Sequence, residues 1–254
     1  MVLTFDFLPQ TAFAFLLIFA RVGAITMSLP GIGDRTVPPR IRLVFALALT
    51  LVLYPLLHNS GVQIPQSLMG MVLALAREVI LGIILGISVR LIISAVQIAG
   101  SVIAMQTGLG FAQSIDPSQG VQTSLFAGFL SVLSITVIFA TDLHHLLLGA
   151  IHDSYQLFPI GHSFVLADFT EMAIKTLSSA FRIALQLSAP FLVFGLIFYL
   201  GVGILSRLIP QVQVFFIAMP ANILMGFIIF MLLLSTLILW YLDYFGTAMT
   251  PFLV

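Results

Sequence analysis

Two long charge-free runs in the last third of this sequence set the strongest limit on how it can fold. Residues 183–206 and 208–242 lack Asp, Glu, Lys and Arg. A helix needs about 20 apolar residues to cross the hydrocarbon core of a bilayer, and both runs exceed that length. Over all 254 residues, 61% are hydrophobic and 7% are charged, whereas soluble domains carry about 25% charged residues. The sequence therefore predicts an all-α integral membrane protein in contact with lipid.

Charge and cysteine content exclude several classes of function. The formal net charge is zero and no run of basic residues occurs, so nucleic acid is not an expected partner. The chain has no cysteine, which excludes disulfides, iron–sulfur clusters and thiol catalysis.

Apolar runs separated by turns rich in Gly, Pro and polar residues predict about six long helices. The third is far longer than a bilayer requires. The expected helices cover residues 8–30, 41–57, 66–106, 123–151, 171–207 and, after a hairpin tip at 207–213, a last run that reaches Asp243.

The segment between the third and fourth predicted helices is unusually rich in glycine and small polar residues. Gly108, Gly110 and Gly120 permit backbone angles that other residues avoid. Asp116-Pro117 is a typical turn start. A supple loop between apolar helices suggests a part that must move or give way.

Among the charged residues inside predicted helices, Arg21, Arg77 and Glu78 are the candidates for a functional role. A charge near the middle of a spanning helix costs about 2.5–3.5 kcal/mol on insertion scales, so it is normally paired or faces a protein interior. For Arg21 we weigh a transport or gating role against a buried polar anchor between helices, and favour the anchor. Arg77 and Glu78 point about 100° apart on one helix and are poor partners for each other. We therefore expect assembly contacts rather than a proton relay.

Gly82 and Gly86 form a small-xxx-small pattern in the third predicted helix. This pattern lets two helices approach closely. The partner helix belongs either to this chain or to another one.

Catalytic and ligand-binding patterns are weak throughout. The group Asp142, His144, His145 and His152 lacks the spacing of a zinc protease, and polar residues at a membrane boundary explain it adequately. Gly108-Leu-Gly110 lacks the Lys and Ser/Thr of a phosphate-binding loop. We predict no metal, no cofactor and no enzymatic activity.

Two classes of function remain from these observations. One is a subunit of a membrane assembly whose central loop lines or plugs a passage. The other is a self-contained secondary transporter for a small solute, with Arg21, Arg77 and Glu78 around a midplane site and Pro190 and Pro220 breaking helices. Transporters often have two similar halves with matching interruptions, and this chain has none, which favours the assembly subunit.

Several separated blocks of sequence resemble the FliR family of type III secretion export-gate proteins. The blocks occur in family order along nearly the whole chain, and together they are specific although each alone is weak. They are Arg21-Val-Gly23, residues 29–33 and 37–42, Arg77 to Gly86, residues 99–112, Asp116-Pro117, Ala189-Pro190, and residues 209–220.

The resemblance implies a fold and a set of partners. Residues 1–170 would form a FliP-like helical part that contains the central Gly-rich loop (about 106–122), and residues 171–254 a FliQ-like hairpin. One copy of the chain would join FliP and FliQ, and also FlhB and FlhA, in the basal body of the flagellum in the bacterial inner membrane. Unfolded flagellar proteins would pass through this gate.

The resemblance also assigns roles to particular residues. The central loop would act as a channel plug, and the tip of the FliQ-like hairpin would include Pro210, Gln211 and Gln213. The plug residues would be Gly108, Leu109, Gly110, Phe111, Ala112, Gln113, Ser114, Asp116, Pro117 and Gly120.

Overall fold

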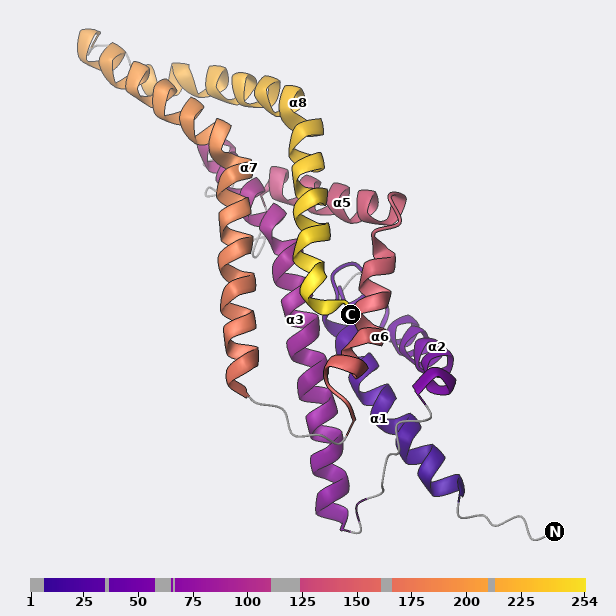
Figure 1. The fold of residues 1–254 in the computed structure, drawn as a ribbon. Helices are drawn as coiled ribbons and strands as arrows, with labels where there is room; N and C mark the ends of the chain where they lie inside the picture. Colours follow the sequence, from indigo (N-terminus) through magenta and orange to yellow (C-terminus); the bar gives the residue numbers. More distant parts are fainter. Residues whose placement is uncertain are drawn as a thin grey trace, which may run out of the picture. The chain divides into compact units, whose positions relative to one another are not determined.

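The structure is a computed structural model, and it describes residues 7–34, 37–57, 65, 67–110, 124–160, 166–209 and 213–254. Within these ranges every regular element is helical, which confirms the all-α prediction (Figure 1). The elements are α1 (Phe7–Ser28), α2 (Pro39–Leu57), α3 (Leu68–Gln106), α5 (Leu125–Ala140), α6 (His144–Leu157), α7 (Leu166–Leu208), α8 (Val214–Met249) and the 3-10 turn η3 (Thr250–Phe252).

The prediction of a single helix over residues 123–151 is wrong, because the structure has two helices there. Helices α5 and α6 are separated by residues 141–143. Asp142 has a φ of 60° there, and a side chain with a Cβ costs energy in that left-handed region, so a regular helix cannot pass through it.

The last helix continues past its predicted end at Asp243. It reaches Met249, and Pro251 lies just beyond it in η3. A single charge does not stop a helix, whereas proline cannot continue one.

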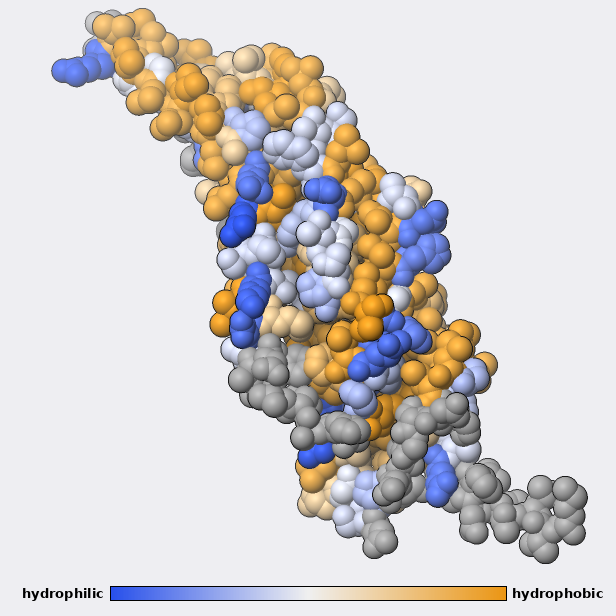
Figure 2. Space-filling model, in the orientation of Figure 1, coloured by the Kyte–Doolittle hydropathy of each residue, from blue (hydrophilic) through white to orange (hydrophobic). Residues whose placement is uncertain are grey.

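Five helical stretches are long and apolar enough to cross a membrane, or six if α5 and α6 count together as one broken span. This confirms the prediction of about six long apolar helices. Figure 2 shows apolar residues over most of the visible face of the molecule. Large apolar side chains such as Val44, Ile197 and Met231 are exposed over more than half of their surface, as expected for a protein whose solvent includes lipid.

The described chain forms two compact units. Unit 1 comprises residues 1–91, 142–177 and 248–254, and unit 2 comprises residues 92–141 and 178–247. In unit 1, apolar side chains of α1, α3 and α6 form a core that includes Ile18, Val22, Leu85 and Ile151.

The core of unit 2 is rich in aromatic rings from α5, α7 and α8. The ring centroids of Phe126 and Phe230 are 4.6 Å apart, and those of Phe191 and Phe230 are 6.3 Å apart. Such pairs add about 0.5–1.5 kcal/mol each beyond the area that they bury. The division into a FliP-like part (1–170) and a FliQ-like part (171–254) concerns likeness to other proteins and stays a prediction.

Candidate functional site

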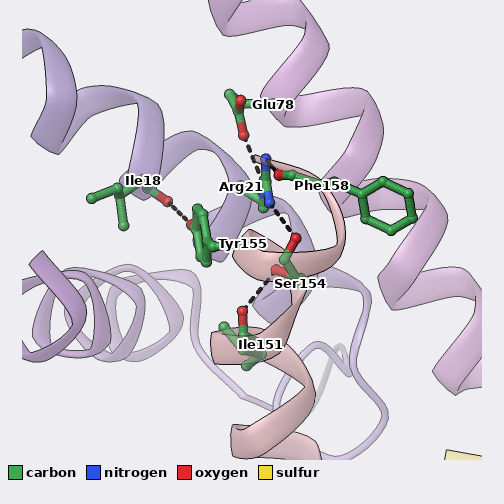
Figure 3. Close-up of polar contacts among 7 residues, drawn as sticks. All are labelled: Ile18, Arg21, Glu78, Ile151, Ser154, Tyr155 and Phe158. Carbon is green, nitrogen blue, oxygen red and sulfur yellow. Dashed lines mark hydrogen bonds and ion pairs between the residues drawn. The ribbon is translucent and has the colours of Figure 1, made fainter. Parts of the chain in front are cut away.

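Among the described residues of unit 1, Arg21 is the most completely buried charged one. It lies on α1 and is 0% exposed, and the facing carboxylate of Glu78 on α3 is 3% exposed. The guanidinium Nε donates to Glu78 Oε2 at 2.6 Å. Figure 3 shows the two side chains pointing toward each other from their separate helices. Each charge is therefore neutralised inside the same unit.

The end of α6 supplies the remaining partners of Arg21. Its two terminal nitrogens donate to the carbonyl oxygens of Ser154 and Phe158, each at 2.8 Å. These carbonyls belong to the last turn of α6 and the residue after it, where the helix dipole is negative and favours a cation. The guanidinium also lies 4.2 Å from the centre of the Tyr155 ring, a cation–π contact.

The hydroxyl of Tyr155 closes this arrangement. It donates to the carbonyl oxygen of Ile18 on α1 at 3.1 Å, as Figure 3 also shows. Arg21 and Tyr155 therefore join α1, α3 and α6 through polar contacts in both directions. This is the geometry of a buried polar anchor, one of the two interpretations that the sequence left open for Arg21.

Arg77 and Glu78 face in different directions, as their spacing predicts. Arg77 is exposed on α3, whereas Glu78 is bound to Arg21. Arg77 therefore does not join the buried pair. Its role in assembly stays a prediction.

Gly82 and Gly86 pack against α1 of the same chain. A Cβ built on Gly82 would lie 2.5 Å from the carbonyl oxygen of Arg21 and 2.6 Å from Cβ of Ala24. One on Gly86 would lie 2.5 Å from Cβ of Ser28. The small-xxx-small pattern thus allows the close approach of α1 and α3 that brings Arg21 to Glu78.

In unit 2, the C-terminal end of α3 forms a second polar cluster, which sequence inspection missed. Asn222 on α8 is 2% exposed, and its Nδ2 donates to the carbonyl oxygen of Gln106 at 3.2 Å and to the hydroxyl of Tyr199 at 3.3 Å. The signal that could have revealed it is the single side-chain amide in the apolar stretch 214–242. Buried amides in such surroundings are normally hydrogen-bonded.

The structure describes the beginning of the predicted plug loop and one end of the hairpin tip. Gly108 has a φ of 79°, and the described chain continues to Gly110. Gln213 is exposed immediately before α8. The predicted site residues that lie outside the described residues are Phe111, Ala112, Gln113, Ser114, Asp116, Pro117, Gly120, Pro210 and Gln211.

The structure brings three of the four weighed metal-ligand candidates together. One ligand atom from each of Asp142, His144 and His145 lies within 4.8 Å of the other two. His152 is not among them, and its Nδ1 lies 2.7 Å from Asp153 Oδ1. The assignment of this group to a polar boundary stays a prediction.

Comparison with known proteins covers most of the chain. Residues 12–248 match the sequence model of the bacterial export proteins, family 1. The chain is 42% identical over 227 residues to the flagellar biosynthetic protein FliR of Caulobacter vibrioides, covering 89% of this chain and 90% of that one.

More distant relatives carry the same name. Identity is 32% over 228 residues to FliR of Bacillus subtilis, covering 88% and 87% of the two chains. It is 28% over 206 residues to FliR of Escherichia coli, covering 81% and 78%. Because the family match extends from the first helix to the last and covers 78–90% of these relatives, this chain belongs to the bacterial export proteins, family 1, as a FliR-type component of the flagellar export apparatus.

Proposed function

We propose that this export-apparatus subunit forms part of the gate through which flagellar proteins leave the cell, and that its central segment, about 106–122, plugs the closed channel. One observation carries the proposal. The segment starts at the end of α3, where Asn222 donates a hydrogen bond to the Gln106 carbonyl oxygen, and Gly108 follows with a φ of 79°. In sequence it has a single formal charge, Asp116. Small and amide side chains suit a seal that binds nothing tightly.

We propose that FliP and FliQ are the direct partners, with one copy of this chain in the assembly, and that FlhB and FlhA are also neighbours. The support is the amount of exposed apolar surface on α2, α7 and α8. Leu51, Ile197 and Met231 are each at least 65% exposed. Large apolar side chains exposed in this number mark contact with other proteins or with lipid. The inner membrane supplies the lipid.

The alternative of a secondary transporter has less support. Its proposed midplane site needs Arg21, Arg77 and Glu78 together, but Arg77 is exposed while the other two are buried. Arg21 already has a carboxylate and two carbonyl oxygens as partners. A solute would have to displace them all. We assign the protein no enzymatic role, metal or cofactor.

Deleting residues 110–116 tests the plug. We expect membranes that contain the deletion gate to conduct ions when no export substrate is present, because nothing would then fill the closed channel. The measurement is ion flux per assembled complex, with the complex quantified by co-purification with FliP and FliQ. A matched control deletes residues 58–64, a segment of equal length elsewhere in the sequence, and it should remain sealed.

Two outcomes contradict the proposal. One is unchanged conductance in a deletion gate that assembles normally. The other is an equal leak in the control deletion, which would mean that the leak comes from a general defect rather than from the missing segment.

A further inference from the structure

We propose that Arg42 and Arg90 bind the phosphate group of an anionic phospholipid at the surface of the membrane. Their guanidinium groups reach one turn of unit 1, residues 31–34, from two different helices, α2 and α3. This ligand site would exist whether or not the central segment plugs a channel.

The turn that the two arginines contact is held by its own hydrogen bonds. Gly31 has a φ of 84°, as is common for a glycine that ends a helix. Its N–H donates to Asp34 Oδ2 at 2.9 Å, and the N–H of Gly33 donates to the carbonyl oxygen of Leu29 at 2.7 Å. The turn is therefore a fixed support for the side chains that reach it.

Arg42 and Arg90 contact consecutive residues of this turn. Arg42 Nη1 donates to the carbonyl oxygen of Gly33 at 3.2 Å. Arg90 Nη2 lies 3.8 Å from Asp34 Oδ1, and both of these side chains are more than one-third exposed. Among the described residues, Arg42 has no ion-pair partner and its buried Nε has no hydrogen-bond acceptor. Two positive charges thus share one carboxylate, which leaves one charge for an anion to balance.

The lengths of α1 and α2 place this turn at the level of lipid headgroups. The helices have 22 and 19 residues, each about enough to cross a bilayer once, and the turn lies between them. Helix α3 runs parallel to α1, because Gly82 lies against Arg21 and Gly86 against Ser28. The part of α3 that precedes Arg90 therefore leads back into the bilayer.

That part of α3 offers an apolar face to the lipid chains. Ile80, Ile83 and Ile87 are 44%, 41% and 47% exposed. Their spacing of three and four residues puts them on one face of the helix with Arg90. A headgroup held by Arg90 would leave its acyl chains beside these isoleucines. A free phosphate ion would use the charges but not this apolar face, so the combination favours a lipid.

Lipid titration of the full-length protein in mild detergent tests the site. The probes are phosphatidylglycerol, which is anionic, and phosphatidylcholine with the same acyl chains, which has no net charge. Native mass spectrometry gives the fraction of protein that retains one lipid. We expect phosphatidylglycerol to bind at least tenfold more tightly. Arg42→Gln and Arg90→Gln should each weaken its binding about fivefold, the contribution of one cation beside an anionic headgroup.

Arg40→Gln is the matched control. Arg40 is exposed at the same end of α2, but residues two apart on a helix do not face the same way, so it does not share the face of Arg42. The same loss of charge there should change the affinity for phosphatidylglycerol less than twofold. Arg42→Lys keeps the charge and should stay within about threefold of the unchanged protein.

Four results would overturn the proposal. Equal binding of the two lipids would mean that the headgroup charge is not recognised. Equal weakening by Arg40→Gln would mean a general attraction to positive charge. Displacement of phosphatidylglycerol by inorganic phosphate, beyond that by chloride at equal ionic strength, would identify a site for a free ion. Unchanged lipid binding with reduced co-purification with FliP and FliQ would assign the two arginines to a protein contact. None of these results bears on the leak of the 110–116 deletion, so the plug proposal stands or fails separately.

Discussion

At the scale of single residues, Arg21 shows how this chain keeps a charge inside an apolar interior. The guanidinium has a carboxylate, two carbonyl oxygens and an aromatic ring around it. Burying an ion pair gains little over an apolar pair of the same size, but removing one partner leaves an uncompensated charge. Removing one member of the pair should therefore destabilise the fold more than replacing both members by apolar residues.

Arg21→Met tests this expectation. Loss of the partner of the buried Glu78 should cost about 3–5 kcal/mol, a fall of several degrees or more in the thermal unfolding midpoint of the protein in detergent. Adding Glu78→Met should restore part of the loss, because no unpaired charge remains. Arg77→Met, next to Glu78 on α3, is the control. Because Arg77 is exposed, we expect its replacement to change the free energy of unfolding by no more than about 0.5 kcal/mol. A double variant no more stable than Arg21→Met would refute the ion-pair argument.

At the scale of helices, the close approach of α1 and α3 depends on glycine. Gly82 lies directly against the Arg21 carbonyl, so the packing of the two helices and the geometry of the ion pair are coupled. In lipid the hydrophobic effect does not drive helices together, so they associate through dispersion contacts between closely packed surfaces. A larger side chain would separate the helices.

Gly82→Leu should weaken assembly of the gate, because the altered unit 1 would no longer present its native surface. The expected result is reduced co-purification with FliP and FliQ at equal expression. Gly23→Ala on α1 is a suitable control, since no heavy atom of a neighbouring element lies within 4 Å of the added Cβ. Alanine also stabilises a helix by about 1 kcal/mol relative to glycine. Normal co-purification of the Gly82→Leu protein would count against this packing argument.

At the scale of the whole molecule, the exposed apolar surface predicts that partners stabilise the chain. A ligand that binds only the folded state stabilises it by about 4 kcal/mol at a concentration 1,000 times its Kd. We therefore expect a higher unfolding midpoint for the tagged protein in a complex with FliP and FliQ than alone in mild detergent. Native mass measurement should give a large hetero-oligomer. A stable monomer or dimer that transports a small solute would instead support the transporter.

Much of the fold follows from local pattern. The charge-free runs, the Gly- and Pro-rich turns and the length of α3 predict most helices to within a few residues. The break at Asp142 was missed because the run 123–151 has no proline or glycine cluster at that point. Nothing local indicates that Asp142 takes a φ of 60°. Such strain persists only where surrounding structure imposes it.

In the candidate site, too, the sequence indicates some features and only the structure reveals the others. The glycines of the central segment, Arg21, Glu78, Gly82 and Gly86 were all identified from residue type and spacing. Their partners were not, because Glu78 is 57 residues from Arg21 and the Ser154 carbonyl is 133 residues away. Asn222 and the end of α3 are separated by 116 residues.

The sequence by itself determined that the chain is helical, apolar and a member of the export-protein family, because hydropathy, turn residues and family blocks are local properties. Only the tertiary structure decided which buried polar groups meet. A buried charge or amide must find partners wherever it lies, and many helices offer carbonyl oxygens at their ends. Which helix end comes close enough is settled by packing between distant segments, as at Gly82 against α1 and Gly226 against Thr107.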